Sequence, residues 1–262
     1  MMRNVPPELL AANHPVLRWL LVAAAVFYVV AFGAAALRFG VARWILAAGA
    51  AVHLAGMTGR GIAIGFFPLT NKMESFSTCA LAMALVGVIA WRPARSYMLP
   101  LLAVGGAAMA TALAFPGHLA WPPPLMRTVW YPLHVPISFV AYGCWTAAAT
   151  ASLSWFADRD GAWLVLVDRL ALWGFALWSL SMIFGGIWGV VAWGAYFMWD
   201  PKVIWSVILW FHYATFVHVR LTPSMQQRTW ARPVLALVGF AFVFVAYVGT
   251  SFFFGRSSHA FS

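Results

Sequence analysis

The chain has 262 residues, of which 64% are hydrophobic and only 8% are charged. Soluble domains have roughly 45–50% apolar and about 25% charged residues, so this composition excludes a soluble globular protein. The formal net charge of +10 would suit a nucleic-acid partner, but the basic residues stand singly or in pairs between long apolar runs. We therefore interpret them as signals of membrane topology and expect no nucleic-acid partner.

Apolar runs long enough to cross a bilayer recur along the whole chain. A transmembrane helix needs about 20 mostly apolar residues. Eight runs approach that length, at residues 16–37, 41–58, 75–91, 97–115, 133–156, 170–191, 203–219 and 233–254. The first run lacks a signal-peptide cleavage pattern, and we expect it to be a retained helix. The sequence predicts an all-α, polytopic integral membrane protein with about eight transmembrane helices, in a single membrane domain over residues 1–262.

The short loops predict the orientation, because Lys and Arg favour the cytoplasmic side. Nine of the sixteen basic residues lie in loops on one side, namely Arg38, Arg43, Arg92, Arg95, Arg159, Arg169, Arg220, Arg228 and Arg232. We assign these loops to the cytoplasm. The N-terminus, residues 60–74, 115–131 and 193–202, and the C-terminal tail then lie on the external side.

An aromatic loop follows the sixth apolar run, at residues 188–202. Five of the sixteen tryptophans lie in or next to it, namely Trp188, Trp193, Trp199, Trp205 and Trp210. An interfacial belt explains an isolated Trp in any membrane protein. This loop has more flat aromatic surface than a belt requires, and aromatic faces stack on a large planar ligand. Part of the loop also has a structural explanation, since Asp200 suits a helix N-cap and Pro201 a first helical position.

Histidines flank this loop on the same predicted side. His134 lies at the external start of the fifth run and His259 just beyond the eighth. Each histidine alone suits an ordinary hydrogen-bonded helix end, but two neutral imidazoles beside an aromatic shelf suit bis-His ligation of heme iron. His118 has the context of a loop residue, and His212 suits a helix-packing donor. Cys79 and Cys144 form no CxxC pair and suit buried packing.

Three segments together resemble the CcsA/ResC-type proteins of System II cytochrome c biogenesis, a heme-handling family with a tryptophan-rich WWD domain. Residues 188–202, continuing to 220, resemble the WWD segment. Residues 65–75, GFFPLTNKMES, resemble the external "FPLSNxYES" stretch of that family. Residues 133–135, LHV, resemble its "LHV" or "MHV" motif.

The resemblance implies a set of heme-binding residues. His134 and His259 would be the external axial ligands of heme b, and His218 would match a histidine of an inner heme site. The heme-contacting loop would comprise Trp188, Trp193, Trp199 and Asp200. His53 also resembles a family histidine, without an assigned role. The sequence departs from the family pattern at Val191, Phe197 and Val203, and two of these changes remove a carboxylate.

The implied function is that of a holocytochrome c synthase (heme lyase) subunit in the bacterial cytoplasmic (inner) membrane. It would export or receive heme and present it externally for thioether attachment to the CxxCH segment of apocytochrome c. Activity would require a ResB/CcsB-type membrane partner. Three alternatives stay open: a CcmC-like heme-delivery protein, an intramembrane diheme electron-transfer subunit with ligands on facing helices, and a heme-free transporter.

Overall fold

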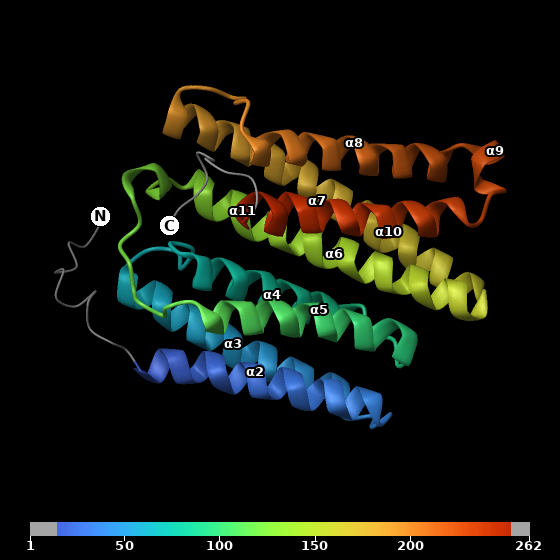
Figure 1. Cartoon of the computed structure of the whole chain (residues 1–262), viewed down its shortest axis with the longest axis horizontal. Helices are drawn as coiled ribbons and strands as arrows, with labels where there is room; N and C mark the ends of the chain where they lie inside the picture. The colour runs from blue at the N-terminus through green and yellow to red at the C-terminus, as the bar shows by residue number, and fades with distance from the viewer. Residues whose placement is uncertain (1–14, 253–262) are drawn as a thin grey trace. The chain divides into compact units, whose positions relative to one another are not determined.

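The computed structural model describes residues 15–252 and is helical over most of that range (Figure 1). In chain order the elements are α2 (Pro15–Ala36), α3 (Ala42–Ile64), α4 (Lys72–Ile89), α5 (Arg95–Ala114), the 3₁₀ turn η1 (Pro124–Met126), α6 (Trp130–Asp158), α7 (Gly161–Trp193), α8 (Pro201–Leu221), α9 (Pro223–Gln226), α10 (Ala231–Phe244), the π-helical turn η2 (Val245–Gly249) and α11 (Thr250–Phe252). Residues 15–252 contain no β-strand, and the predicted all-α fold is confirmed.

Each of the eight predicted apolar runs coincides with a long helix. Seven helices within the described range are long and apolar enough to cross a membrane: α2, α3, α4, α5, α7, α8 and the continuous stretch Ala231–Gly249. The eighth, α6, has 29 residues but is not among those seven. The chain is a multi-pass membrane protein.

The burial of α6 explains its lower hydropathy. Every residue from 141 to 152 is buried. The hydroxyls of Thr146 and Ser152 each donate at 2.8 Å to a carbonyl one turn earlier, on Tyr142 and Ala148. A helix shielded from lipid needs no apolar outer surface, and Ser or Thr hydroxyls can be satisfied by their own helix. The buried stretch of α6 therefore accommodates hydroxyl side chains.

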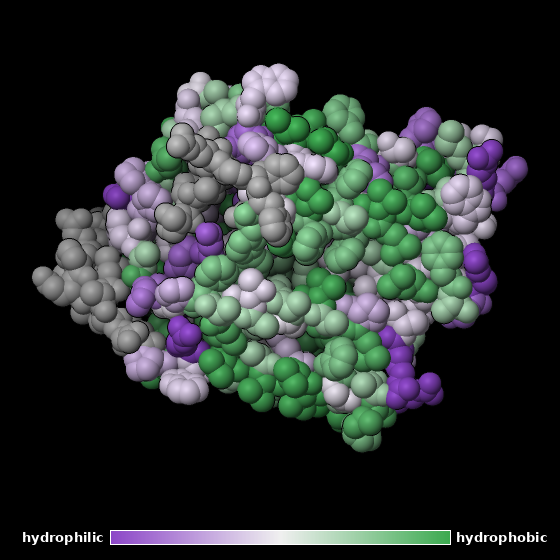
Figure 2. Space-filling view, viewed as in Figure 1, coloured by the Kyte–Doolittle hydropathy of each residue, from purple (hydrophilic) through white to green (hydrophobic). Residues whose placement is uncertain are grey.

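Apolar surface covers the flanks of the helices. Figure 2 shows hydrophobic side chains along the helices and hydrophilic side chains gathered at helix ends. Large apolar residues stay exposed in the middle of the chain's helices or near their ends, for example Val29 at 71%, Ile62 at 77% and Ile89 at 79%. Continuous exposed apolar surface of this kind marks contact with a membrane or a partner.

The described chain divides into two compact units, of residues 15–132 and 133–252. The first contains α2 to α5, and the second contains most of α6 together with α7 to α11. The expectation of a single membrane domain stays a prediction.

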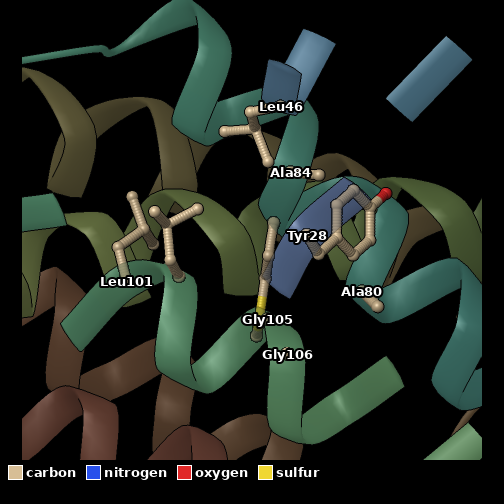
Figure 3. A pocket seen from close by; sticks show the side chains of 9 residues that line it. Tyr28, Leu46, Ala80, Ala84, Leu101, Gly105 and Gly106 are labelled. Carbon is tan, nitrogen blue, oxygen red and sulfur yellow. The ribbon is translucent and has the colours of Figure 1, made fainter. Parts of the chain in front are cut away.

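The first unit contains a small hollow with a mainly apolar lining. Figure 3 shows a hollow lined by Tyr28 of α2, Leu46 of α3, Ala84 of α4 and Leu101 of α5. Its volume of about 10 Å³ is near the minimum for one water molecule. The hollow is therefore too small for a porphyrin.

A buried histidine joins three helices of the first unit. The ring of His53 on α3 is fully buried. Its Nδ1 lies 2.9 Å from the Tyr28 hydroxyl on α2, and its Nε2 lies 2.7 Å from the Ser77 hydroxyl on α4. Because both ring nitrogens have hydrogen-bond partners, His53 serves helix packing.

The predicted external end of the first unit contains a buried ion pair. Arg60 on α3 donates to Glu74 Oε1 from Nε at 3.0 Å and from Nη2 at 2.8 Å, and the two side chains are 1% and 0% exposed. Glu74 Oε2 also accepts from the backbone N–H and the hydroxyl of Thr70, at 2.8 and 2.9 Å. Arg60 donates further to the carbonyls of Gly117 and His118, at 3.1 and 3.0 Å. The pair thus connects α3, the start of α4 and the segment after α5.

An aromatic stack forms the core of the second unit. Trp145 of α6 and Tyr213 of α8 are both fully buried, with ring centroids 3.8 Å apart and planes within 2° of parallel. The indole N–H of Trp145 donates to the carbonyl of Ala171 on α7 at 3.2 Å. A Cβ on Gly174 would lie 2.3 Å from that nitrogen, and one on Gly239 would lie 2.5 Å from the Tyr213 hydroxyl. Only glycine allows α7 and α10 to approach the stack this closely.

Charged residues gather at the predicted cytoplasmic end of the second unit. Asp168 of α7 forms ion pairs with Arg220 at the end of α8 and with Arg232 at the start of α10. One carboxylate therefore joins three helices. At the end of α6, Asp158 accepts a hydrogen bond from the backbone N–H of Asp160 at 3.0 Å. This bond, and secondly a bond from the indole N–H of Trp163, lower the pKa of the Asp158 carboxyl.

Candidate functional site

His134 lies on the second turn of α6 and is held by a hydrogen bond from its ring. Its Nδ1 lies 2.8 Å from the backbone carbonyl of Ser181 on α7. Because a carbonyl oxygen can only accept, Nδ1 must carry the proton in this contact, and Nε2 then carries the ring's lone pair. Metal-binding histidines in proteins are commonly oriented in this way, by a carbonyl on the nitrogen that does not face the metal.

Two serines fix the backbone around this imidazole. The hydroxyls of Ser138 and Ser181 lie 2.6 Å apart, and they lie 3.0 and 2.9 Å from the His134 carbonyl, so their two protons are shared among these three contacts. The Ser181 hydroxyl also lies 2.9 Å from His134 Nδ1. The contacts join α6 to α7 at the level of the histidine, so the ring is attached to two helices.

Two tryptophans near the end of α7 pack beside the His134 ring: Trp188 contacts the ring, and Trp193 contacts Trp188. The ring of Trp188 is stacked on that of His134, with centroids 6.1 Å apart and an interplanar angle of 24°. Trp193 packs edge-on against Trp188 at 4.6 Å. Trp188 is only 2% exposed, and Trp193 is half-buried. Trp188 therefore contacts the histidine rather than presenting a free face.

The loop differs in extent from the predicted residues 188–202. α7 continues to Trp193, so Trp188 and Trp193 are helical and the connection to α8 is only Gly194–Asp200. Helix α7 ends at Gly194, whose φ of 74° is a left-handed conformation that favours glycine. The predicted loop began too early because its start was set by the aromatic motif, whereas the helix continues two residues beyond the apolar run, to Trp193.

The connection presents the exposed aromatic rings of the site. Tyr196, Phe197 and Trp199 are 64%, 46% and 86% exposed. Phe197 and Trp199 meet edge to face, with centroids 5.3 Å apart. On α7, a Cβ on Gly186 would lie 2.4 Å from the Tyr196 ring, and one on Gly189 would lie 2.9 Å from the carbonyl of Ala195. The glycines thus allow the loop to lie directly on the helix.

The predicted helix cap at Asp200 is confirmed. Asp200 is 5% exposed, and its side chain accepts from the backbone N–H of Lys202 at 2.9 Å, with Pro201 as the first residue of α8. Asn71 accepts in the same way from the backbone N–H of Glu74, at 2.9 Å. The buried carboxylate of Asp200 thus has a structural role at the start of α8.

The other candidate histidines lie apart from this site or outside the described residues. His259 falls beyond residue 252 and is not described. His218 is exposed on the last turn of α8, two residues from Arg220 at the opposite end of that helix from Asp200. His212 Nε2 lies 2.8 Å from the carbonyl of Leu235, which confirms its role in helix packing. Cys79 and Cys144 are buried and free, as predicted.

Ser181 and the Arg60–Glu74 pair were not predicted from the sequence. A serine in an apolar helix gives no signal of its own, because its hydroxyl usually bonds within the helix. Arg60 and Glu74 were detectable, since charges at the edges of apolar runs are expensive unless paired. No group of three His, Cys, Asp or Glu side chains within residues 15–252 could hold a metal ion.

Together, the long apolar helices, the oriented imidazole and the exposed aromatic loop define a multi-pass membrane protein with a candidate planar-ligand site at one end of α6 and α7. The family model described as Cytochrome C assembly protein matches residues 66–255. The chain belongs to this family, and the predicted resemblance to CcsA-type cytochrome c biogenesis proteins is confirmed.

Individual relatives agree with this membership. The chain is 26% identical over 264 residues to the cytochrome c biogenesis protein CcsA of Porphyra purpurea, covering 78% of this chain and 82% of that protein. It is 29% identical, with the same coverage, to CcsA of Thermosynechococcus vestitus. Among solved structures it resembles the cytochrome c heme lyase CcmF, with a TM-score of 0.71 at 16% identity. That match covers 98% of this chain but only 48% of CcmF, so the chain spans about half the length of that structure.

Proposed function

We propose that this chain is the heme-handling subunit of a cytochrome c synthase, which holds heme at the His134 end of α6 and α7 and presents it to apocytochrome c. The observation that carries the proposal is the hydrogen bond from His134 Nδ1 to the Ser181 carbonyl, at 2.8 Å. It leaves the lone pair on Nε2, the nitrogen that an axial histidine uses. The family membership and the names of the relatives, a cytochrome c biogenesis protein and a heme lyase, support the same function.

The residues at this end of the second unit fit a porphyrin. Heme, as heme b, is here the substrate that passes through the protein. His134 supplies one axial nitrogen, and His259 is proposed as the second. The exposed rings of Tyr196, Phe197 and Trp199 offer faces against which a planar macrocycle can stack. Trp188, Trp193 and Asp200 support the site from within, since they are buried or half-buried.

Thioether formation requires the protein to position heme rather than to supply a general acid or base. Each thioether forms when the S–H of a CxxCH cysteine adds across a heme vinyl group: sulfur bonds one vinyl carbon and hydrogen the other, with no net oxidation. His134 and the aromatic loop would hold the ring still, which converts the encounter into a near-unimolecular step. The histidine of the incoming CxxCH would then replace one axial histidine, and product release would follow.

Heme would reach this site from an inner one. His218 is exposed on the last turn of α8, where its imidazole would be accessible to heme. We place this end of the protein at the cytoplasmic face of a bacterial inner membrane and the His134 end outside. A ResB/CcsB-type membrane protein would complete the synthase.

The intramembrane diheme alternative receives less support. It requires histidines with open coordination on facing helices. His53 does not meet this requirement, because both of its ring nitrogens are bonded, to Tyr28 and Ser77. A CcmC-like delivery protein would share the external site and would differ in the reaction that follows.

A visible spectrum and pyridine hemochrome assay test the proposal. The detergent-purified chain, coexpressed with a ResB-type partner, is compared with His134→Ala and His259→Ala. The control is His118→Ala, an exposed loop histidine whose identified contacts use its backbone carbonyl. We expect a reduced bis-His spectrum that weakens in both site variants and recovers with added imidazole, but is unchanged in the control. Heme retained unchanged in both site variants would refute the proposal.

A further inference from the structure

Three residues of α7 together form a seat for the His134 ring. Ser181, Gly185 and Trp188 are spaced i, i+4 and i+7, so they share one face of the helix. Ser181 supplies the carbonyl that holds Nδ1 at 2.8 Å, and Trp188 supplies a stacked ring at 6.1 Å. Each residue of this face therefore meets the same imidazole.

Gly185 supplies the space in which the ring lies. A Cβ at this position would lie 2.7 Å from Cε1, 2.8 Å from Nδ1 and 3.3 Å from Nε2 of His134. Contacts under about 3 Å are not tolerated between these atoms, and the ring is held on α6 and by Ser181. Even alanine at 185 would displace the imidazole from its hydrogen bond.

Trp188 contacts the histidine from a buried position. Its 2% exposure leaves almost no surface for a ligand, whereas Trp199 in the same motif is 86% exposed. Within the aromatic motif, Trp188 thus packs on His134, whereas Trp199 stays exposed. An interaction of Trp188 with heme would have to pass through the imidazole.

We propose that Gly185 and Trp188, together with the Ser181 carbonyl, are positioning residues for His134, which set the plane of its ring and the direction of its Nε2 lone pair. This inference rests on the proposed function in taking His134 as a heme ligand. The outer rings Tyr196, Phe197 and Trp199 then make up the surface that contacts heme. Mutation of the residues that support a metal-binding histidine typically lowers metal affinity by about 10–100-fold.

The test compares two neighbouring glycines. Gly185→Ala places its methyl against His134, whereas the matched control Gly186→Ala places it against Tyr196. Heme is titrated into each purified complex with and without imidazole, and the reduction midpoint is recorded. We expect Gly185→Ala to lose about tenfold or more in heme affinity, to shift the midpoint and to be restored by imidazole. Loss in Gly186→Ala should not be restored by imidazole, because its axial ligand stays in place.

Variants of Trp188 provide an independent test of the proposal if Gly185→Ala does not fold. Trp188→Phe keeps a ring against His134 and should retain most heme affinity, whereas Trp188→Leu should lose it in an imidazole-reversible way. In heme-free protein, ¹⁵N-histidine NMR should show His134 protonated at Nδ1 in the wild type and a tautomer mixture in Trp188→Leu and Gly185→Ala.

The outcomes separate the two proposals. If His134→Ala keeps its heme, the proposed function fails, while the NMR measurement of the His134 tautomer still tests whether Gly185 and Trp188 position the ring. If His134→Ala loses heme but the Gly185 and Trp188 variants show no imidazole-reversible loss and no change of tautomer, the seat is refuted and the proposed function stands.

Discussion

Replacing Glu74 by glutamine should strongly destabilise the first unit. The carboxylate accepts four hydrogen bonds, two from Arg60 and two from Thr70, and it is fully buried. Glutamine keeps the shape and the backbone N–H that Asn71 caps, but its amide NH₂ would face one set of donors and the charge of Arg60 would be unpaired. Removing one member of a buried ion pair costs about 3–5 kcal/mol, and we expect a loss of this size in the free energy of unfolding.

The assay is SDS-induced unfolding of the detergent-solubilised protein, followed by circular dichroism. The single variants Glu74→Gln and Arg60→Met are compared with the double variant. Because no unpaired charge remains in the double variant, it should lose clearly less than the sum of the two single losses. A Glu74→Gln variant within about 0.5 kcal/mol of wild type, or strictly additive losses, would show that the pair is not the buried network described.

Three further predictions concern the second unit. Gly174→Ala should lose about 1–3 kcal/mol by overpacking against Trp145, while the control Gly33→Ala, with open space around it, should be neutral or stabilising in the same unfolding assay. Asp200→Ala should cost about 1 kcal/mol through the lost α8 cap and Asp200→Asn much less; equal losses would mean that the carboxylate charge matters. Asp168→Asn should cost about 1–2 kcal/mol, reduced by the partial exposure of its arginine partners, and an unchanged midpoint would contradict the described ion pairs.

Much of the architecture could be predicted because it depends on local properties of the chain. A segment that crosses lipid must be apolar over its length and must bond its own backbone groups, so hydropathy alone located all eight long helices. The caps at Asn71 and Asp200 were equally local, since a cap and its target are two or three residues apart. The aromatic motif at 188–202 and its family were likewise legible in the sequence.

The sequence thus determined by itself that this is a helical membrane protein of the cytochrome c assembly family, and it pointed to His134. Only the tertiary structure decided that the His134 ring meets a carbonyl 47 residues later, that Trp188 packs on that ring, and that Arg60 pairs with Glu74. The physical reason is that such contacts depend on how each helix is rotated against its neighbours. That rotation is set by close packing of glycines and large rings between helices, which no single apolar run encodes.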